Sequence, residues 1–183
     1  MVGSLVAVSV VLLIILYYGY SRQLNRQATI LPPPLSMISL TSSAFNHTGI
    51  IPARYTCDGA DSQPALVIAN VPANARSLAL VVDDPDSPSK NFVHWLIWNI
   101  KPVNQTIEEG KIPEGSSQGK NGFGRIGYGG PCPQSGTHRY FFKLLALDVP
   151  DLNLPAGATI NDFNKAAEGH VVDYAVLIGL YSR

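Results

Sequence analysis

Hydrophobic residues from about Ser36 onward follow a pattern that is typical of β-strands. Short apolar runs, some unbroken and some alternating with polar residues, are separated by Gly, Pro, Asn and Asp. An alternating pattern places successive side chains on opposite faces of a sheet. The sequence therefore predicts a mainly β domain, with strands at residues 77–82, 94–100, 139–148 and 173–182.

One segment has a helical pattern instead. Residues 159–170 can form a helix whose first turn is capped by Thr159, Asn161 or Asp162. Residues 110–136 show little periodicity and many glycines, which favours a long loop. A loop of that length inside a compact domain is usually functional or disordered.

The first twenty residues differ from the rest because they contain no charged side chain and are rich in Val, Leu and Ile. About twenty apolar residues suffice for a membrane-spanning helix, and Tyr17, Tyr18 and Tyr20 would lie at the membrane interface. A buried helix of a soluble protein is the alternative. We interpret residues 1–21 as a transmembrane anchor or an uncleaved signal, so we expect attachment to a membrane through this N-terminal helix.

The residues after this segment predict a linker and give conflicting signals about orientation. Arg22 and Arg26 follow the predicted span, and the positive-inside rule taken alone would leave the domain in the cytoplasm. We leave the side open, with a slight preference for an extracytoplasmic domain. Residues 22–35 are polar and then Pro-rich, and the run Pro32–Pro34 favours an extended spacer. The folded domain is predicted to cover residues 36–183.

Composition narrows the classes of function. The chain has 183 residues, of which 46% are hydrophobic, enough for one domain with its own core. Thirteen basic and thirteen acidic residues cancel, and no basic stripe is present, so we expect no nucleic-acid partner. Cys57 and Cys132 are too few for a zinc knuckle, and they can form one disulfide or remain thiols.

Two segments carry the polar residues of a predicted binding site. Asp84 and Asp86 follow a predicted strand, and His94 begins the next one. Carboxylates at the end of a strand can point into a shared cleft, although Asp and Pro are also the usual residues of a plain turn.

The second segment runs from Gly127 to Phe142. Gly129 and Gly130 can bring backbone N–H groups close to an anion, and Pro131 stiffens the turn. His138 and Tyr140 then lie on one face of the following strand. If the two segments meet, imidazole and N–H donors suit a phosphate oxygen while the carboxylates suit an ammonium group, so a small zwitterion would fit.

Four ordered motifs are similar to those of a known family. The stretches "DPDSP", "HWLIWNI", "GPCPQSGTHRY" and "EGHVVDYAVLIGLYSR" resemble the phosphatidylethanolamine-binding protein family, in particular its Raf kinase inhibitor-like branch of bacteria and archaea. The resemblance extends from about Ile38 to Arg183. It implies a large antiparallel sheet packed on a smaller one, with one or two peripheral helices and a small anion pocket at one end.

The resemblance also implies a set of site residues. The expected ligand-binding residues are Asp84, Asp86, His94, Gly130, Pro131, His138 and Tyr140. Trp95 is expected at the rim of the pocket because of its position on the strand that His94 begins, and Cys132 because it belongs to the glycine turn. Cys132 and Gln134 replace prolines of other branches, so the rim is expected to differ here.

The expected function is a binding module for a small anionic or phosphorylated ligand, without catalysis and without a cofactor. Members of the family act as modulators, so a kinase or protease partner is also expected. One alternative is a hydrolase that uses Cys132 with His138, or a metal held by His94, His138 and a carboxylate. The other is an inhibitor of a protease or kinase that acts through surface loops, chiefly the Gly-rich segment 110–124.

Overall fold

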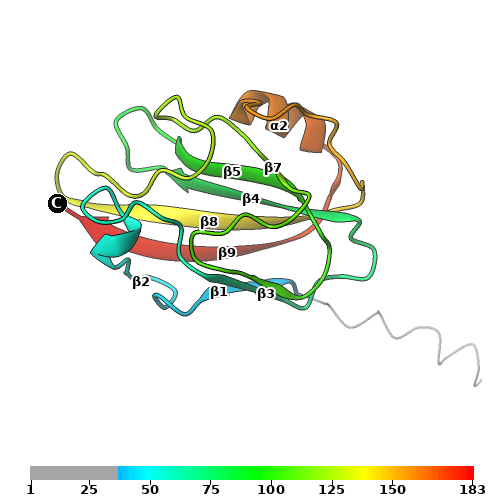
Figure 1. Cartoon of the computed structure of the whole chain (residues 1–183), viewed down its shortest axis with the longest axis horizontal. Coiled ribbons are helices and arrows are strands. Elements are labelled where there is room, and N and C mark those ends of the chain that lie inside the picture. Colours follow the sequence, from blue (N-terminus) through cyan, green and yellow to red (C-terminus); the bar gives the residue numbers. More distant parts are fainter. Residues whose placement is uncertain (1–36) are drawn as a thin grey trace, which may run out of the picture. The chain divides into compact units, whose positions relative to one another are not determined.

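A computed structural model describes residues 37–183 of the protein, which form two β-sheets and one α-helix (Figure 1). The smaller sheet has three antiparallel strands in the order β1-β3-β6. These strands are β1 (Ser39–Ser42), β3 (Leu66–Ala69) and β6 (Gln105–Ile107).

The larger sheet has six strands in the order β2-β9-β8-β4-β5-β7. All of its neighbouring pairs are antiparallel except β2 with β9, which is parallel. The strands are β2 (Gly49–Ile50), β4 (Ser77–Asp84), β5 (Phe92–Ile100), β7 (Ser117–Gln118), β8 (Thr137–Leu147) and β9 (Val171–Ser182). A 3-10 turn, η1 (Ala53–Tyr55), follows β2.

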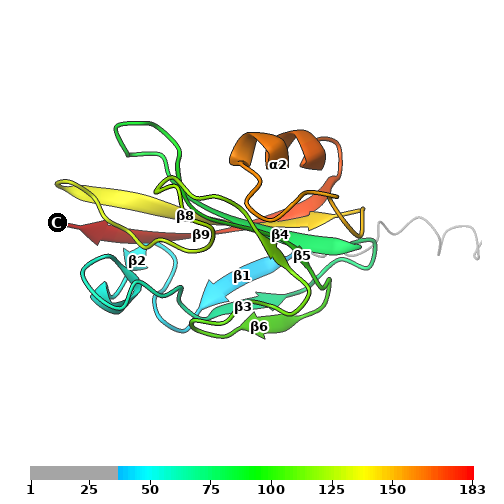
Figure 2. The ribbon, with the colours of Figure 1, turned by 45° about the horizontal axis from the view of Figure 1, so that its top comes forward.

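The large sheet is covered on both faces. Figure 2 shows the small sheet on one side of it and helix α2 (Ile160–Ala167) on the other. All eight residues of β4 are buried, since this strand lies inside the sheet between β5 and β8. Leu78, Leu80 and Val82 pack toward the small sheet, while Ala79 and Val81 belong to the core under α2.

Helix α2 begins with a complete capping box. The hydroxyl of Thr159 accepts a hydrogen bond from the Asp162 backbone N–H, and the Asp162 carboxylate accepts one from the Thr159 N–H. Phe163 is the large side chain by which the helix is anchored, because it is 1% exposed and its ring lies 6.5 Å from that of Trp98.

The structure confirms the predicted fold class and the four predicted strands, which correspond to β4, β5, β8 and β9. The helix and its Thr159 cap are also confirmed. The loop at residues 110–136 is largely irregular but contains the short strand β7. Strands β1, β2, β3 and β6 were not predicted, because each has four residues or fewer and so offers little periodicity.

The prediction of membrane attachment needs correction. Across residues 37–183 no helix is long and apolar enough to cross a membrane, and α2 has only eight residues. The span predicted at residues 1–21 and the linker at 22–35 lie outside the described residues. Membrane anchoring and a location on either side of a membrane therefore find no support in this structure, and we take them no further.

Replacing Phe163 by Ala should destabilise the domain by about 3–5 kcal/mol, because it removes a fully buried ring and leaves a cavity between α2 and the sheet. Urea denaturation would measure the loss. Lys165→Ala, on the exposed side of the same helix, should change the free energy of unfolding by less than about 0.5 kcal/mol. Equal effects of the two substitutions would contradict the anchoring role of Phe163.

Candidate ligand-binding site

A cavity of about 290 Å³ lies at the end of the large sheet where β4 passes into the loop that leads to β5. We call it the histidine cavity, because His94 on β5 and His138 on β8 both line it. The other lining residues are Asp84, Ser87, Pro88, Ser89, Phe92, Phe123, Cys132, Pro133 and Gln134.

A partly buried hydrogen bond joins Asp84 and His138 across the neighbouring strands β4 and β8. His138 Nδ1 lies 2.7 Å from Asp84 Oδ2, and the side chains are 13% and 4% exposed, respectively. The other carboxylate oxygen of Asp84 accepts the backbone N–H of Asp86 at 2.8 Å. Because a carboxylate accepts, the His138 Nδ1 carries the proton, and Nε2 is the nitrogen left for a ligand.

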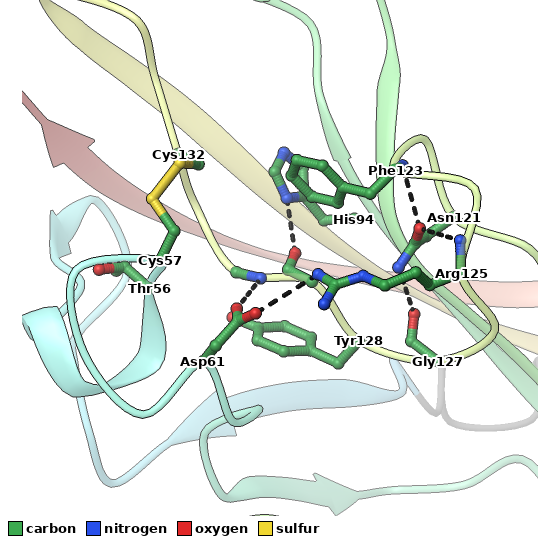
Figure 3. Close-up of polar contacts among 12 residues, drawn as sticks. Thr56, Cys57, Asp61, His94, Asn121, Phe123, Arg125, Gly127, Tyr128 and Cys132 are labelled. Carbon is green, nitrogen blue, oxygen red and sulfur yellow. Dashed lines mark hydrogen bonds and ion pairs between the residues drawn. A yellow bond between two sulfur atoms is a disulfide. The ribbon is translucent and has the colours of Figure 1, made fainter.

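His94 has the same arrangement with a different partner. Its Nδ1 donates to the carbonyl oxygen of Gly129 at 2.7 Å, which again leaves Nε2 for a ligand (Figure 3). The ring is packed edge-on against Phe123 and Tyr140, with centroids 5.6 and 5.2 Å away. Burial lowers the pKa of His94, so this imidazole is neutral when the cavity contains no anion.

Neither Tyr140 nor Trp95 lines the cavity, although the Tyr140 ring contacts that of His94. Tyr140 is fully buried, and its hydroxyl has no hydrogen-bond partner among the described residues. Burial raises the pKa of Tyr140, and the negative charge of Asp84 raises it further, so the hydroxyl stays protonated. Trp95 packs into the core toward the small sheet and donates from Nε1 to Gln118 Oε1 at 2.8 Å.

Asp86 was expected to bind the ligand, but its carboxylate is paired with Arg139. It receives two hydrogen bonds from the guanidinium of Arg139, at 2.8 and 2.6 Å, and a third from the Arg139 backbone N–H at 3.0 Å. These bonds hold the pKa of Asp86 at about 2. Its carboxylate does not line the histidine cavity, so in this structure it orders the end of β8.

The glycine turn also differs from expectation, because its N–H groups are already used. Gly129 N–H donates to the carbonyl oxygen of His94 at 2.9 Å, and Gly130 N–H donates to Asp61 Oδ1 at 2.6 Å. A Cβ on Gly130 would lie 2.5 Å from the Tyr55 carbonyl oxygen. Gly130 therefore permits close packing of two backbones, and neither it nor Pro131 lines the cavity.

A disulfide fixes the same turn to the loop after η1. Cys57 and Cys132 are bonded and stand 75 residues apart, which decides between the two states that the sequence left open (Figure 3). The backbone N–H of Cys57 also donates to the Pro131 carbonyl oxygen at 3.1 Å. Cys132 lines the histidine cavity, as expected for a rim residue.

Two supporting residues were not predicted from the sequence. The buried side chain of Asn121 accepts the N–H groups of Phe123 and Arg125 and donates to the Gly127 carbonyl oxygen, so it shapes the loop that carries Phe123 to the cavity (Figure 3). The Asn-Gly pair at 121–122 is a turn signal that could have indicated this role. Asp61 has no such signal, because it acts on a residue 69 positions away.

The structure bears on both versions of the hydrolase hypothesis, the one with a Cys132 thiolate and the one with a metal ion. Cys132 is bonded to Cys57, so it offers no thiolate next to His138. Between residues 37 and 183, no group of three or more His, Cys, Asp or Glu side chains is arranged to hold a metal ion.

Comparisons with known proteins identify relatives of the chain. The sequence pattern of the phosphatidylethanolamine-binding protein family matches residues 41–182. A UPF0098 protein of Methanothermobacter thermautotrophicus is 52% identical over 151 residues, which cover 80% of this chain and 99% of that protein. A UPF0098 protein of Pyrococcus horikoshii is 48% identical over 151 residues, covering 78% of this chain and 75% of that protein.

Two solved structures are similar to the described domain. A phosphatidylethanolamine-binding protein homologue from Chlamydia trachomatis has a TM-score of 0.77 at 38% identity, covering 81% of this chain and 99% of that chain. E. coli YBCL, described as a member of the mammalian PEBP family, has a TM-score of 0.75 at 25% identity, covering 80% and 98%. The relatives come from archaea and bacteria, which agrees with the microbial branch that the motifs resemble.

Gly130→Ala should destabilise the domain by about 1–3 kcal/mol, because the added methyl group would overlap the backbone of Tyr55 and Thr56, which cannot yield as a side chain can. Thermal unfolding would measure this. Ser135→Ala, at an exposed position of the same segment, should leave the midpoint nearly unchanged. A Gly130→Ala midpoint equal to that of the wild type would contradict the close approach.

The stability contributed by Asp86 should depend on pH. Its pKa is about 2 in the folded protein and ordinarily 3.8, so between these values the unfolded state binds more protons. The contribution is therefore complete above about pH 4 and is lost as the pH falls toward 2. In urea denaturation, the difference between wild type and Asp86→Asn should shrink over that interval, and Arg139→Gln should show the same trend. A difference that is independent of pH would contradict the pairing.

Proposed function

Because the chain belongs to the phosphatidylethanolamine-binding protein family, we propose that its histidine cavity binds a small anionic or phosphorylated ligand and does not transform it. The cavity is at the small end of the range for ligand sites, which suits a molecule of head-group size.

The observation that carries this proposal is the shared arrangement of His94 and His138. Each ring uses Nδ1 for a protein acceptor, so two Nε2 atoms are left for one ligand. Among residues 37–183, no Lys or Arg lines the cavity, and the one carboxylate that does, that of Asp84, is already bonded to His138. Positive charge for an anion must therefore come from the imidazoles themselves.

Binding of a phosphate ester should consequently take up a proton. The pKa of His94 is lowered by burial, and an anion beside Nε2 would raise it again by stabilising the imidazolium. The charged ring could then donate to a phosphate oxygen, which is a stronger bond than a neutral pair would give. Affinity should increase as the pH falls from about 8 toward the pKa of the ligand-free His94.

A binding role also agrees with the hydrogen bonds of the cavity hydroxyls. The hydroxyl oxygens of Ser87 and Ser89 lie 3.2 Å apart and share a hydrogen bond. In the described part of the chain, the imidazoles of His94 and His138 are hydrogen-bonded to Gly129 and Asp84 and not to these hydroxyls.

Calorimetric titration of the full chain with phosphoethanolamine, in the presence of a chelator, tests the proposal. His138→Ala should weaken binding by at least about tenfold, the equivalent of one charge-assisted hydrogen bond. Repeating the titration in two buffers with different heats of ionisation should reveal proton uptake by the protein.

His170→Ala provides a matched control. His170 Nδ1 is also bonded to a carboxylate, that of Asp148 at 2.8 Å, but this pair lies on the surface and outside the cavity. Affinity should be unchanged in this variant. Equal loss in both variants, or no binding by the wild type, would overturn the proposed function.

A further inference from the structure

The Cys57–Cys132 disulfide connects the exposed surface with the wall of the histidine cavity. Cys57 is exposed, whereas Cys132 is partly buried and lines the cavity. Among the described residues there is no other cysteine with which either could exchange. A thiol in solution can therefore approach the bond from the Cys57 side.

Arg183 makes the two sulfur atoms unequal as leaving groups. Its Nη1 lies 3.5 Å from Cys132 Sγ, and its Nη2 is held by Asp58 Oδ1 at 2.7 Å. Asp58 also accepts the hydroxyl of Tyr181 at 2.7 Å, so the guanidinium is kept in place. A fixed guanidinium stabilises a thiolate, and a stabilised thiolate leaves more readily in thiol–disulfide exchange.

We propose that Cys57 is a thiol–disulfide exchange site through which small thiols control ligand binding in the histidine cavity. A thiolate attacks Cys57 Sγ and forms a new disulfide bond there, while the Cys57–Cys132 bond breaks. Its electron pair leaves on Cys132 Sγ, beside Arg183. A second thiol releases Cys57, so that two protein thiols and one oxidised reductant are the products.

The consequence for the cavity follows from the turn that Cys132 belongs to. The carbonyl oxygen of Gly129, three residues away, accepts the proton of His94 Nδ1 and thereby fixes which nitrogen a ligand meets. Opening the disulfide removes the covalent tie of this turn and places a thiol or thiolate in the cavity wall. Both a less firmly held Gly129 and a negative charge on Cys132 should weaken the binding of an anion in the cavity.

The exchange step is tested with glutathione on the full chain, followed by alkylation and peptide mass spectrometry. Glutathione should be found on Cys57 and the alkyl group on Cys132. Arg183→Gln should slow the exchange, while Arg76→Gln, which alters an exposed arginine elsewhere, should not. Glutathione attached mainly to Cys132, or a disulfide that resists glutathione in the folded protein, would overturn the inference.

The coupling to the cavity has two readouts. Reduction should shift the imidazole NMR signals of His94, and it should weaken phosphoethanolamine binding by about tenfold, as for one lost charge-assisted hydrogen bond. The Cys57→Ser/Cys132→Ser variant should bind weakly with or without reductant. The binding measurement rests on the proposed function, whereas the NMR measurement does not.

The two failures can therefore be told apart. An oxidised protein that does not bind phosphoethanolamine would overturn the proposed function, and the His94 signals would still decide the present inference. His94 signals that are identical in the oxidised and reduced protein would overturn the coupling.

Discussion

The structure depends on one constraint: the six-stranded sheet must be covered on both faces. Successive side chains of β4 therefore pack alternately into the core under the small sheet and the core under α2. Asp83 and Asp84, which follow the apolar part of the strand, continue this alternation. Asp84 turns to the histidine cavity and bonds to His138. Asp83 turns to the α2 side and bonds to Lys143 Nζ at 2.5 Å. Each buried carboxylate therefore has a partner from β8, as the cost of burying an unpaired charge requires.

Much of this arrangement could be predicted because β4, β5, β8 and β9 are long enough to show either an unbroken apolar run or an alternating pattern. Helix α2 could be predicted from its cap, since the Thr159 side chain satisfies a backbone donor wherever the helix packs. Short strands such as β2 and β7, of two residues each, form only because neighbouring strands supply their partners. Their own residues carry no pattern from which they could be recognised.

The site was predictable to the extent that it lies on the long strands. Asp84, His94 and His138 meet as expected, because strand alternation fixes the direction of each side chain. Asp86 lies beyond the end of β4, where alternation no longer applies, and it pairs with Arg139 instead. The use of Gly130 N–H by Asp61 is a contact across 69 residues, which depends on how two loops pack and not on either loop's sequence.

The distribution of charge around the cavity limits what it can bind. Two arginines in the loops and strand around the cavity are each paired with a carboxylate: Arg139 with Asp86 and Arg125 with Asp61. These pairs order the loops, but their charges are largely cancelled before they reach a ligand. An anion of the kind proposed would therefore draw its counter-charge from an imidazole, and burial makes the charged state of His94 costly unless such an anion is present. The same burial that keeps the His94 imidazole uncharged would thus favour ligands whose negative charge is concentrated enough to hold a proton on the ring.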